Sequence, residues 1–230
     1  MDIADKRWTI TAQNTLTPTK KFLSQLSIKV RTDQFALFRE IFNPNKSTII
    51  LDVGVASEEI LPDSNMFEKL YPHQANITLA TIENRVKLKK IYPKSRVVQI
   101  YPHRKLPFRK REFDVAVSWA TIEHVGNYKR QREFLCEMSR VANSIFLTTP
   151  YRGCIYEPHT GFFFLHWLPL KWFRKICLMT GRNFWATEKN LNPLYIKNIK
   201  AMSLSKNLVI KKYNMWGVLP SHLIIYTTKK

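Results

Sequence analysis

Short apolar runs alternate with amphipathic segments through the middle of the chain. The runs are rich in β-branched residues, which favour buried strands in a sheet that is covered on both faces. Seven such runs predict strands, over residues 48–53, 76–82, 96–100, 113–118, 145–149, 208–210 and 222–227. Apolar positions three or four apart predict helices between them, over 65–71, 85–91 and 128–142. This alternation predicts an α/β fold with a doubly wound, mostly parallel seven-stranded sheet, whose ligand binds at the carboxyl ends of the strands.

The N-terminal segment departs from this alternation. Residues 1–32 mix polar side chains with isolated apolar ones, and we predict a loosely packed arm there. Helical spacing of apolar residues begins at Phe35 and continues to Phe42. We therefore predict a helix that Asp33 caps and that stops at 43–45.

The segment after Pro150 breaks the alternation again, because it is rich in aromatic residues. An insertion after the fifth strand lies over the ligand end of the sheet, where it is suited to a lid or a substrate platform. We predict a single domain over 1–230. Its parts are an N-terminal arm and helix, a ligand-binding core, an aromatic-rich helical insertion and a C-terminal strand pair, over 1–46, 47–150, 151–206 and 207–230.

Composition narrows the class of protein. With 230 residues and 45% hydrophobic composition, the chain can bury one sizeable core. Its three cysteines, Cys136, Cys154 and Cys177, form no CxxC pair, which argues against a disulfide framework and a structural zinc site. The N-terminus has no secretory-signal pattern, and no apolar run is long enough to span a membrane. We expect a cytoplasmic protein.

The charge balance favours anionic partners. Lys plus Arg number 37 against 17 Asp plus Glu, which gives a formal net charge of +20. Such a charge raises the local concentration of nucleic acid, anionic lipid or a phosphorylated substrate. The alternative is a lysine-rich surface that only solvates the protein.

Two acidic residues stand at the ends of predicted strands. Asp52 and Gly54 close the first strand, where a carboxylate can bond a ligand amine or hydroxyl and a glycine lets the backbone approach the ligand. Glu83 follows the second strand, and its two oxygens match the two hydroxyls of a ribose. An ordinary strand-to-helix turn and a solvated glutamate are the alternatives.

Four motifs occur between residues 47 and 150 in this order: IILDVGVAS, the acid in ATIEN, LPFRKREFDVAVSWATIEHV and IFLTTP. Their order and spacing resemble those of class I S-adenosylmethionine-dependent methyltransferases, in the small-molecule, type 11-like branch. Further along, EPHTGFFFLHWLP resembles a segment of bacterial methyltransferases from cell-envelope polysaccharide gene clusters. The resemblance implies a Rossmann-like fold and methyl transfer to a hydroxyl or similar nucleophile of a small or glycan-like acceptor.

The resemblance also implies how the cofactor, S-adenosylmethionine, is bound. The residues it assigns to the cofactor are Asp52, Gly54, Val55, Ala56, Glu83, Pro102, His103 and Ser118. The first four would hold the amino-acid part, Glu83 the ribose, the 101–104 loop the adenine, and Ser118 the region of the sulfonium. Ala56 and Glu58 replace glycines that are usual in the family, and Pro102 stands near where an acid often meets the adenine. A non-catalytic protein of the same fold is therefore an alternative.

Transfer to a hydroxyl also requires a group that removes a proton. His124 follows the fourth predicted strand, and an imidazole titrates near neutral pH, although a structural role at a helix start is the alternative. His159, oriented by Glu157, is the rival catalytic base. We also considered a metal site made of Glu157, His159 and His166, and we predict none, because Pro158 and the phenylalanines that follow favour packing.

The stretch 161–182 interleaves aromatic and cationic residues. It favours a lid over the active site, and it also suits an interfacial segment on anionic lipid. Both roles are compatible if the acceptor is a lipid-linked glycan, in which case the protein is peripheral at the inner face of the membrane. An RNA-modifying methyltransferase is the alternative, but Ser118-Trp119-Ala120-Thr121 replaces the usual base-acceptor motif and disfavours base methylation. The sequence indicates no oligomeric state.

Overall fold

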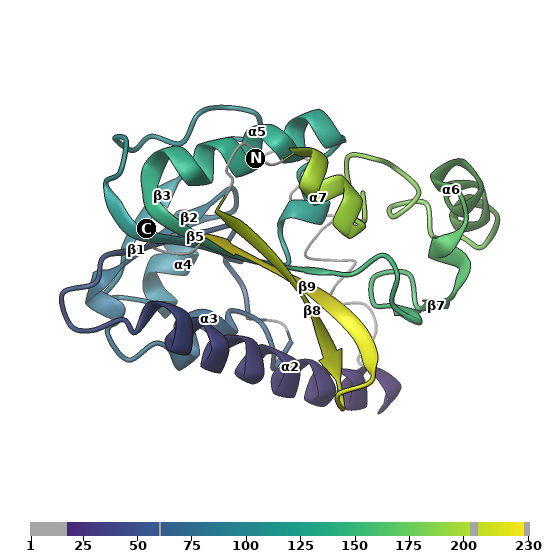
Figure 1. Cartoon of the computed structure of the whole chain (residues 1–230), viewed down its shortest axis with the longest axis horizontal. Coiled ribbons are helices and arrows are strands. Elements are labelled where there is room, and N and C mark those ends of the chain that lie inside the picture. Colours follow the sequence, from purple (N-terminus) through teal and green to yellow (C-terminus); the bar gives the residue numbers. More distant parts are fainter. Residues whose placement is uncertain (1–17, 60, 203–206, 228–230) are drawn as a thin grey trace. The chain divides into compact units, whose positions relative to one another are not determined.

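The computed structural model describes residues 18–59, 61–202 and 207–227. The chain forms two compact units, Met1–Tyr101 and Pro102–Lys230, which we call the N-terminal unit and the C-terminal unit. Figure 1 traces their helices and strands along the sequence. Each unit is described separately below.

The N-terminal unit contains a parallel sheet. Its elements are α2 (Pro18–Phe42), β1 (Ile50–Val53), α3 (Met66–Leu70), η1 (Gln74–Asn76), β2 (Ile77–Thr81), α4 (Arg85–Ile91) and β3 (Arg96–Gln99). The strand order is β3-β2-β1, and Leu79 of β2 lies opposite both Asp52 and Val97. Every residue of β1 and β2 is buried, as expected for central parallel strands.

Helix α2 corrects the prediction for the N-terminal segment. It begins at Pro18, so residues 18–32 are helical and not a loose arm, and the predicted cap Asp33 lies inside the helix, bonded to Lys29 Nζ at 2.8 Å. The apolar stripe of Phe35 and Phe38 continues backwards to the buried Val30, which the polar neighbours of Val30 obscured. The predicted stop is confirmed, because α2 ends before the 43–45 segment. The prediction for residues 1–17 lies outside the described residues.

The C-terminal unit contains a mixed sheet and the insertion. Its elements are β4 (Phe113–Trp119), η2 (Ile122–His124), α5 (Tyr128–Val141), β5 (Ala142–Pro150), β6 (Tyr156–Glu157), β7 (Phe162–Phe163), η3 (Leu165–Trp167), α6 (Leu170–Met179), α7 (Ile196–Met202), β8 (Leu208–Met215) and β9 (Leu219–Thr227). The strand order is β4-β5-β9-β8, in which β4 and β5 are parallel and β9 is antiparallel to both its neighbours. The insertion holds the small β6–β7 pair and the helices α6 and α7.

The parallel strands of the N-terminal unit and the mixed strands of the C-terminal unit are seven in number and mostly parallel, and helices accompany them in each unit, so the predicted fold class is confirmed. Strand β8 is longer than the predicted 208–210, because the exposed Lys211 and Lys212 interrupt its apolar pattern without ending its pairing with β9. Among the described helices, not one combines the length and the apolar character that a bilayer crossing requires. The single domain over 1–230 stays a prediction.

Two charged side chains of α5 hold the turn-rich link before β4. Glu137 Oε2 accepts from Leu106 N–H at 2.8 Å, and Arg140 donates to the carbonyls of Leu106 and Phe108 at 2.9 and 2.8 Å. Arg140 Nε also donates to Glu137 Oε1 at 2.8 Å. The hydrogen bond from Arg140, followed by that from Leu106 and the nearby positive charges, outweighs partial burial and lowers the pKa of Glu137.

Candidate active site

The loop after β1 carries the predicted cofactor residues of the N-terminal unit. Gly54 has φ 96, which L side chains rarely adopt, and its N–H donates to Ala80 O at 2.9 Å. The loop then brings Ser57 to the end of β2. There Ser57 N–H and Oγ–H both donate to Glu83 Oε2, at 2.6 and 2.7 Å. The loop after β1 and the residue after β2 are thus joined, as the parallel arrangement predicts.

Glu83 offers acceptors that suit a ribose. It is half-buried, and its Oε1 has no hydrogen-bond partner among the described residues. A carboxylate oxygen accepts two hydrogen bonds, so Oε1 can accept from both hydroxyls of a ribose, while Oε2 already accepts two from Ser57. Glu58, which replaces a glycine that is usual in the resembled family, pairs with Lys87 of α4. The donor and acceptor set at this edge therefore fits a nucleoside.

Asp52 is part of a buried acidic pair. Its side chain is 4% exposed and bonds to that of Glu68 on α3, which is 3% exposed. Burial, together with the charge of Glu68, raises the pKa of Asp52 well above its ordinary value, and burial raises the pKa of Glu68 to about 7. The pair therefore holds a proton near neutral pH. The positions of Asp52 and Glu68 in the sequence did not indicate that their side chains form a pair. The predicted contact of Asp52 with the cofactor stays a prediction.

The remaining cofactor candidates lie in both units. In the N-terminal unit Val55 is buried, and Ala56 exchanges two hydrogen bonds with the side chain of Asn65, at 3.0 and 3.3 Å. In the C-terminal unit Ser118 is buried near the end of β4, while Pro102 and His103 are exposed. Sequence reasoning missed Asn65, which braces the loop after β1.

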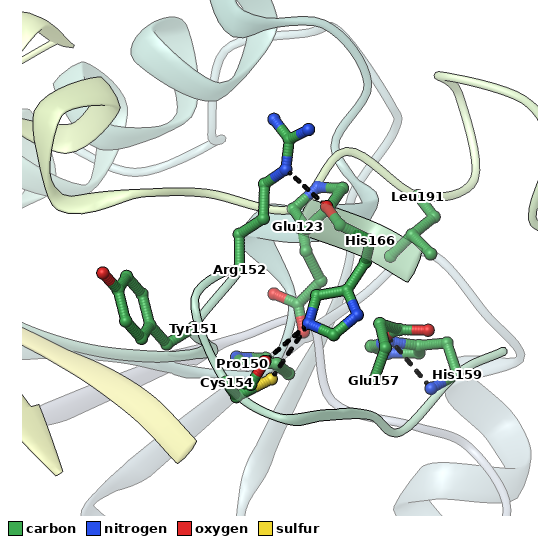
Figure 2. A pocket seen from close by; sticks show the side chains of 10 residues that line it. Glu123, Pro150, Tyr151, Arg152, Cys154, Glu157, His159, His166 and Leu191 are labelled. Atoms are coloured by element: carbon green, nitrogen blue, oxygen red, sulfur yellow. Dashed lines mark hydrogen bonds and ion pairs between the residues drawn. The ribbon is translucent and has the colours of Figure 1, made fainter. Parts of the chain in front are cut away.

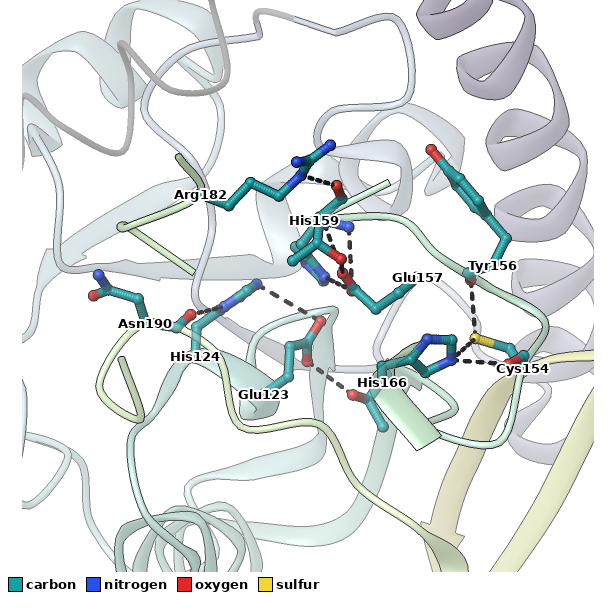
Figure 3. A network of polar contacts seen from close by, with 11 residues as sticks. Glu123, His124, Cys154, Tyr156, Glu157, His159, His166, Arg182 and Asn190 are labelled. Carbon is teal, nitrogen blue, oxygen red and sulfur yellow. Dashed lines mark hydrogen bonds and ion pairs between the residues drawn. The ribbon is translucent and has the colours of Figure 1, made fainter. Parts of the chain in front are cut away.

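The C-terminal unit brings the two rival catalytic bases together. His124 ends η2, and His159 lies in the turn between β6 and β7. Their ring centroids are 4.7 Å apart and the rings are nearly perpendicular, at 84°. Trp185 packs against both rings. Figure 3 shows the two imidazoles within one polar network.

Each imidazole is oriented by an oxygen at its Nδ1. His124 Nδ1–H donates to Asn190 O at 2.6 Å, and His159 Nδ1–H donates to Glu157 Oε1 at the same distance. Glu157 is 3% exposed and also accepts from the N–H and hydroxyl of Thr160. Burial alone would raise the pKa of Glu157, but the charge of His159 and these hydrogen bonds lower it to about 2. The predicted orienting role of Glu157 matches this geometry.

His124 is held in its neutral form. Burial is the main cause, and the neighbouring charge of His159 adds to it, so the pKa of His124 falls to about 3. The Asn190 carbonyl and Glu157 act in the opposite direction without reversing the shift. Because Nδ1 carries the proton in this form, Nε2 carries the lone pair.

Glu123 precedes His124 and faces the same cluster. Its side chain is 1% exposed, Oε2 accepts from Thr149 Oγ–H at 2.9 Å, and Oε1 lies 3.8 Å from His124 Nε2. The turn is fixed from behind by one side-chain amide and one backbone N–H. Gln131 Nε2 donates to Ile122 O at 3.0 Å, and the backbone N–H of Asn192 donates to Glu123 O at 2.7 Å. Sequence reasoning missed Glu123 and both of these supports, since glutamate beside a helix-start histidine reads as structural.

A small pocket opens beside this cluster. Figure 2 shows Glu123, Cys154, Glu157, His159 and His166 among its lining residues, and it has room for about one water molecule at most. His166 is fully buried, and its Nε2–H donates to Cys154 O at 2.8 Å. That bond ties one nitrogen of His166 to the backbone, and the absence of a metal site made of Glu157, His159 and His166 stays a prediction.

Comparisons with known proteins find methyltransferases among the proteins that this chain resembles. Residues 63–144 match the methyltransferase domain family. The solved structure of a SAM-dependent methyltransferase from Methanosarcina mazei aligns at 14% identity and a TM-score of 0.53, over 84% of this chain and 96% of that one. One from Aquifex aeolicus aligns at 12% identity and a TM-score of 0.51, over 94% and 100%. The fold is that of S-adenosylmethionine-dependent methyltransferases.

A further methyltransferase structure was solved with ligands. Geranyl diphosphate C-methyltransferase from Streptomyces coelicolor A3(2), in complex with Mg²⁺, geranyl diphosphate and S-adenosyl-L-homocysteine, aligns at 11% identity and a TM-score of 0.53, over 88% of this chain and 81% of that one. The comparison with curated proteins finds no match. The domain match and the methyltransferase fold support S-adenosylmethionine as the cofactor and do not identify an acceptor.

Proposed function

We propose that the chain transfers a methyl group from S-adenosylmethionine to a hydroxyl, or a similar nucleophile, of a small or glycan-like acceptor. The observation that carries the proposal is the junction of the loop after β1 with Glu83 at the end of β2, in a methyltransferase fold. When bound, S-adenosylmethionine supplies an electrophilic methyl group. The residues of the chain bind and orient the two reactants.

The cofactor-binding roles follow from the residues at the strand ends. Glu83 accepts hydrogen bonds from the ribose, and the backbone of Gly54, Val55 and Ala56 lines the amino-acid part. Asp52 acts on this loop through its buried pairing with Glu68 or directly on the cofactor's amino group. The roles of Pro102 and His103 at the adenine and of Ser118 near the sulfonium rest on the family resemblance.

The acceptor hydroxyl is received by His124 and His159. In the transfer a carbon–oxygen bond would form, the carbon–sulfur bond of the cofactor would break, and the hydroxyl proton would pass to Nε2 of one of the two imidazoles. The two imidazoles lie edge to face, and each is oriented at Nδ1 by an oxygen, which supports a role in holding the reacting oxygen. These are the two catalytic residues of the proposal.

The acceptor class rests on the resemblance of the insertion to methyltransferases of cell-envelope polysaccharide clusters. A surface of the C-terminal unit supports a lipid-linked form of such an acceptor. Half of the exposed large hydrophobic side chains of the described chain fall within residues 163–179: Phe163, Phe164, Trp167, Leu168, Trp172, Leu178 and Met179.

The same segment is cationic. Residues 158–187 contain no Asp or Glu, but they contain Lys171, Arg174, Lys175 and Arg182. Aromatic side chains beside lysine and arginine suit the interface of an anionic bilayer. Peripheral contact with such a membrane is the location that we propose, and RNA is the competing anionic partner.

Calorimetric titration with S-adenosylhomocysteine tests the cofactor part. The wild-type chain should bind it, and Glu83→Ala should weaken binding by about tenfold or more, since charge-assisted hydrogen bonds contribute about 1.5–3 kcal/mol. Glu40→Ala, an exposed glutamate of α2, is the matched control and should bind like the wild type. An absence of binding heat at millimolar ligand would leave a non-catalytic protein of this fold.

Labelling with radioactive cofactor tests the acceptor part. The chain should label a lipid-linked glycan fraction and should sediment with anionic vesicles more than with neutral ones. Label in RNA, with none in the glycan fraction, would select the RNA alternative.

A further inference from the structure

Three side chains of the C-terminal unit form a cluster with the composition of a metal site. One potential ligand atom each of Glu123, His124 and His159 lies within 4.8 Å of the other two. Sequence analysis did not group these residues, because two belong to η2 and the third follows β6. We propose that Glu123, His124 and His159 bind a divalent transition-metal ion.

The hydrogen bonds of the two rings favour this. Asn190 O accepts the Nδ1 proton of His124, and Glu157 accepts that of His159. This tautomer presents Nε2 as the ligand, and a backbone carbonyl or carboxylate behind Nδ1 is the usual support of a metal-bound histidine. Thr149 supports Glu123 in the same way, by donating to Oε2, while Oε1 lies 3.8 Å from His124 Nε2.

The spacing requires only small movements. Three atoms that are at most 4.8 Å apart fit within a circle of about 2.8 Å radius, whereas zinc bonds to nitrogen and oxygen are about 2.0–2.2 Å long. Each ligand atom therefore has to move by less than about 1 Å. Side-chain rotation provides such a shift, and η2 and its amide supports can stay in place.

The donor set also selects the class of ion. Two imidazoles and one carboxylate suit zinc, iron, cobalt or manganese, whereas calcium and magnesium prefer oxygen ligands throughout. Three protein ligands leave one position of a tetrahedral ion for a further oxygen. The acidic side chains of Glu123 and Glu157 are both buried at this cluster, within a chain whose net charge is +20, which suits a bound cation.

The role of the ion rests on the proposed function, although its binding does not. With an ion present, His124 and His159 serve as its ligands, and the acceptor oxygen takes the remaining position. A metal-bound hydroxyl loses its proton more readily than a free one, because the positive ion stabilises the oxyanion.

Cobalt binding tests the site directly. The chelator-treated full chain should bind one Co²⁺ with visible absorption of low-symmetry coordination, and Zn²⁺ should displace it. His124→Asn and His159→Asn should each weaken Co²⁺ binding by more than about 100-fold, since removing a ligand costs more than removing a supporting group. His222→Asn, at a histidine of β9 outside the cluster, is the control and should bind as the wild type does. Equal binding by all three variants would overturn the site.

X-ray absorption of the zinc-loaded wild type needs no variant. It should show two imidazole ligands with oxygen in the remaining positions, and a sulfur ligand or a single imidazole would overturn the assignment. Loss of methyl transfer on metal removal, with restoration by Zn²⁺ or Co²⁺, would support the role of the ion. Unchanged transfer would overturn that role alone. Absence of cofactor binding would refute the proposed function and leave the measured metal site standing.

Discussion

The buried pair of Asp52 and Glu68 predicts an unusual pH dependence of stability. Glu68→Gln removes one titrating group and keeps a side chain of the same shape that can donate a hydrogen bond to Asp52. In the wild type, burial raises the pKa of Glu68 from its ordinary 4.5 to about 7. Between these pH values the folded state binds more protons than the unfolded state, so the free energy of unfolding falls as pH rises.

The magnitude follows from the two pKa values. A change from 4.5 to about 7 corresponds to about 3 kcal/mol in total, most of which is lost between pH 5 and pH 8. The stabilising effect of Glu68→Gln relative to the wild type should therefore grow by about 2–3 kcal/mol over this range. Above pH 8 the difference should level off, because the wild-type carboxyl is then ionised in both states.

Urea unfolding followed by far-UV circular dichroism at pH 5, 6, 7 and 8 measures this difference. Glu40→Gln, at an exposed position of α2, is the control and should differ from the wild type by the same amount at every pH. If the curves of Glu68→Gln and the wild type run parallel across the range, the buried pair does not hold a proton and the reasoning is refuted.

Three further outcomes are expected. Arg140→Ala should destabilise the protein by about 1–2 kcal/mol in thermal unfolding, because it frees backbone carbonyls at 106–108 that are partly exposed. Arg140 also lowers the pKa of Glu137, so their pairing should add a loss that is present above pH 4.5 and fades as pH falls through the lowered pKa, whereas a wholly pH-independent loss would contradict the pairing. Gly54→Ala should cost at least about 1 kcal/mol at its positive φ, and an unchanged melting temperature would show that the loop adapts. His124→Asn should slow methyl transfer about 100-fold or more and leave the affinity for S-adenosylhomocysteine unchanged, and a parallel loss of affinity would indicate a structural role.

The sequence was informative where one pattern dominated a segment. The buried strands β1 and β2 are continuous apolar runs, and their ends could be predicted to within about two residues. The helix over 18–32 was missed, because Lys29 and Asp33 interrupt the apolar pattern around the buried Val30. Its packing, and not its local pattern, reveals the helix.

The residues of the candidate site were likewise only partly predictable from the sequence. Glu83 and His124 could be selected because each follows a predicted strand, and strand ends collect ligand-binding residues. The contact between His124 and His159 could not be predicted, since 35 positions separate them and the turn after β6 is set by tertiary packing. The same holds for Glu68, which lies on another element from Asp52 and changes its protonation.

The hydrogen bonds from Ser57 to Glu83 have a consequence for ligand discrimination. They hold the carboxylate in one rotamer before any ligand arrives, so a nucleoside meets an acceptor that has already lost its side-chain freedom. A deoxyribose analogue would leave that rigid acceptor facing a carbon, and the carboxylate could not turn away without breaking both serine bonds. We expect the protein to reject deoxy analogues more strongly than a freely rotating glutamate would.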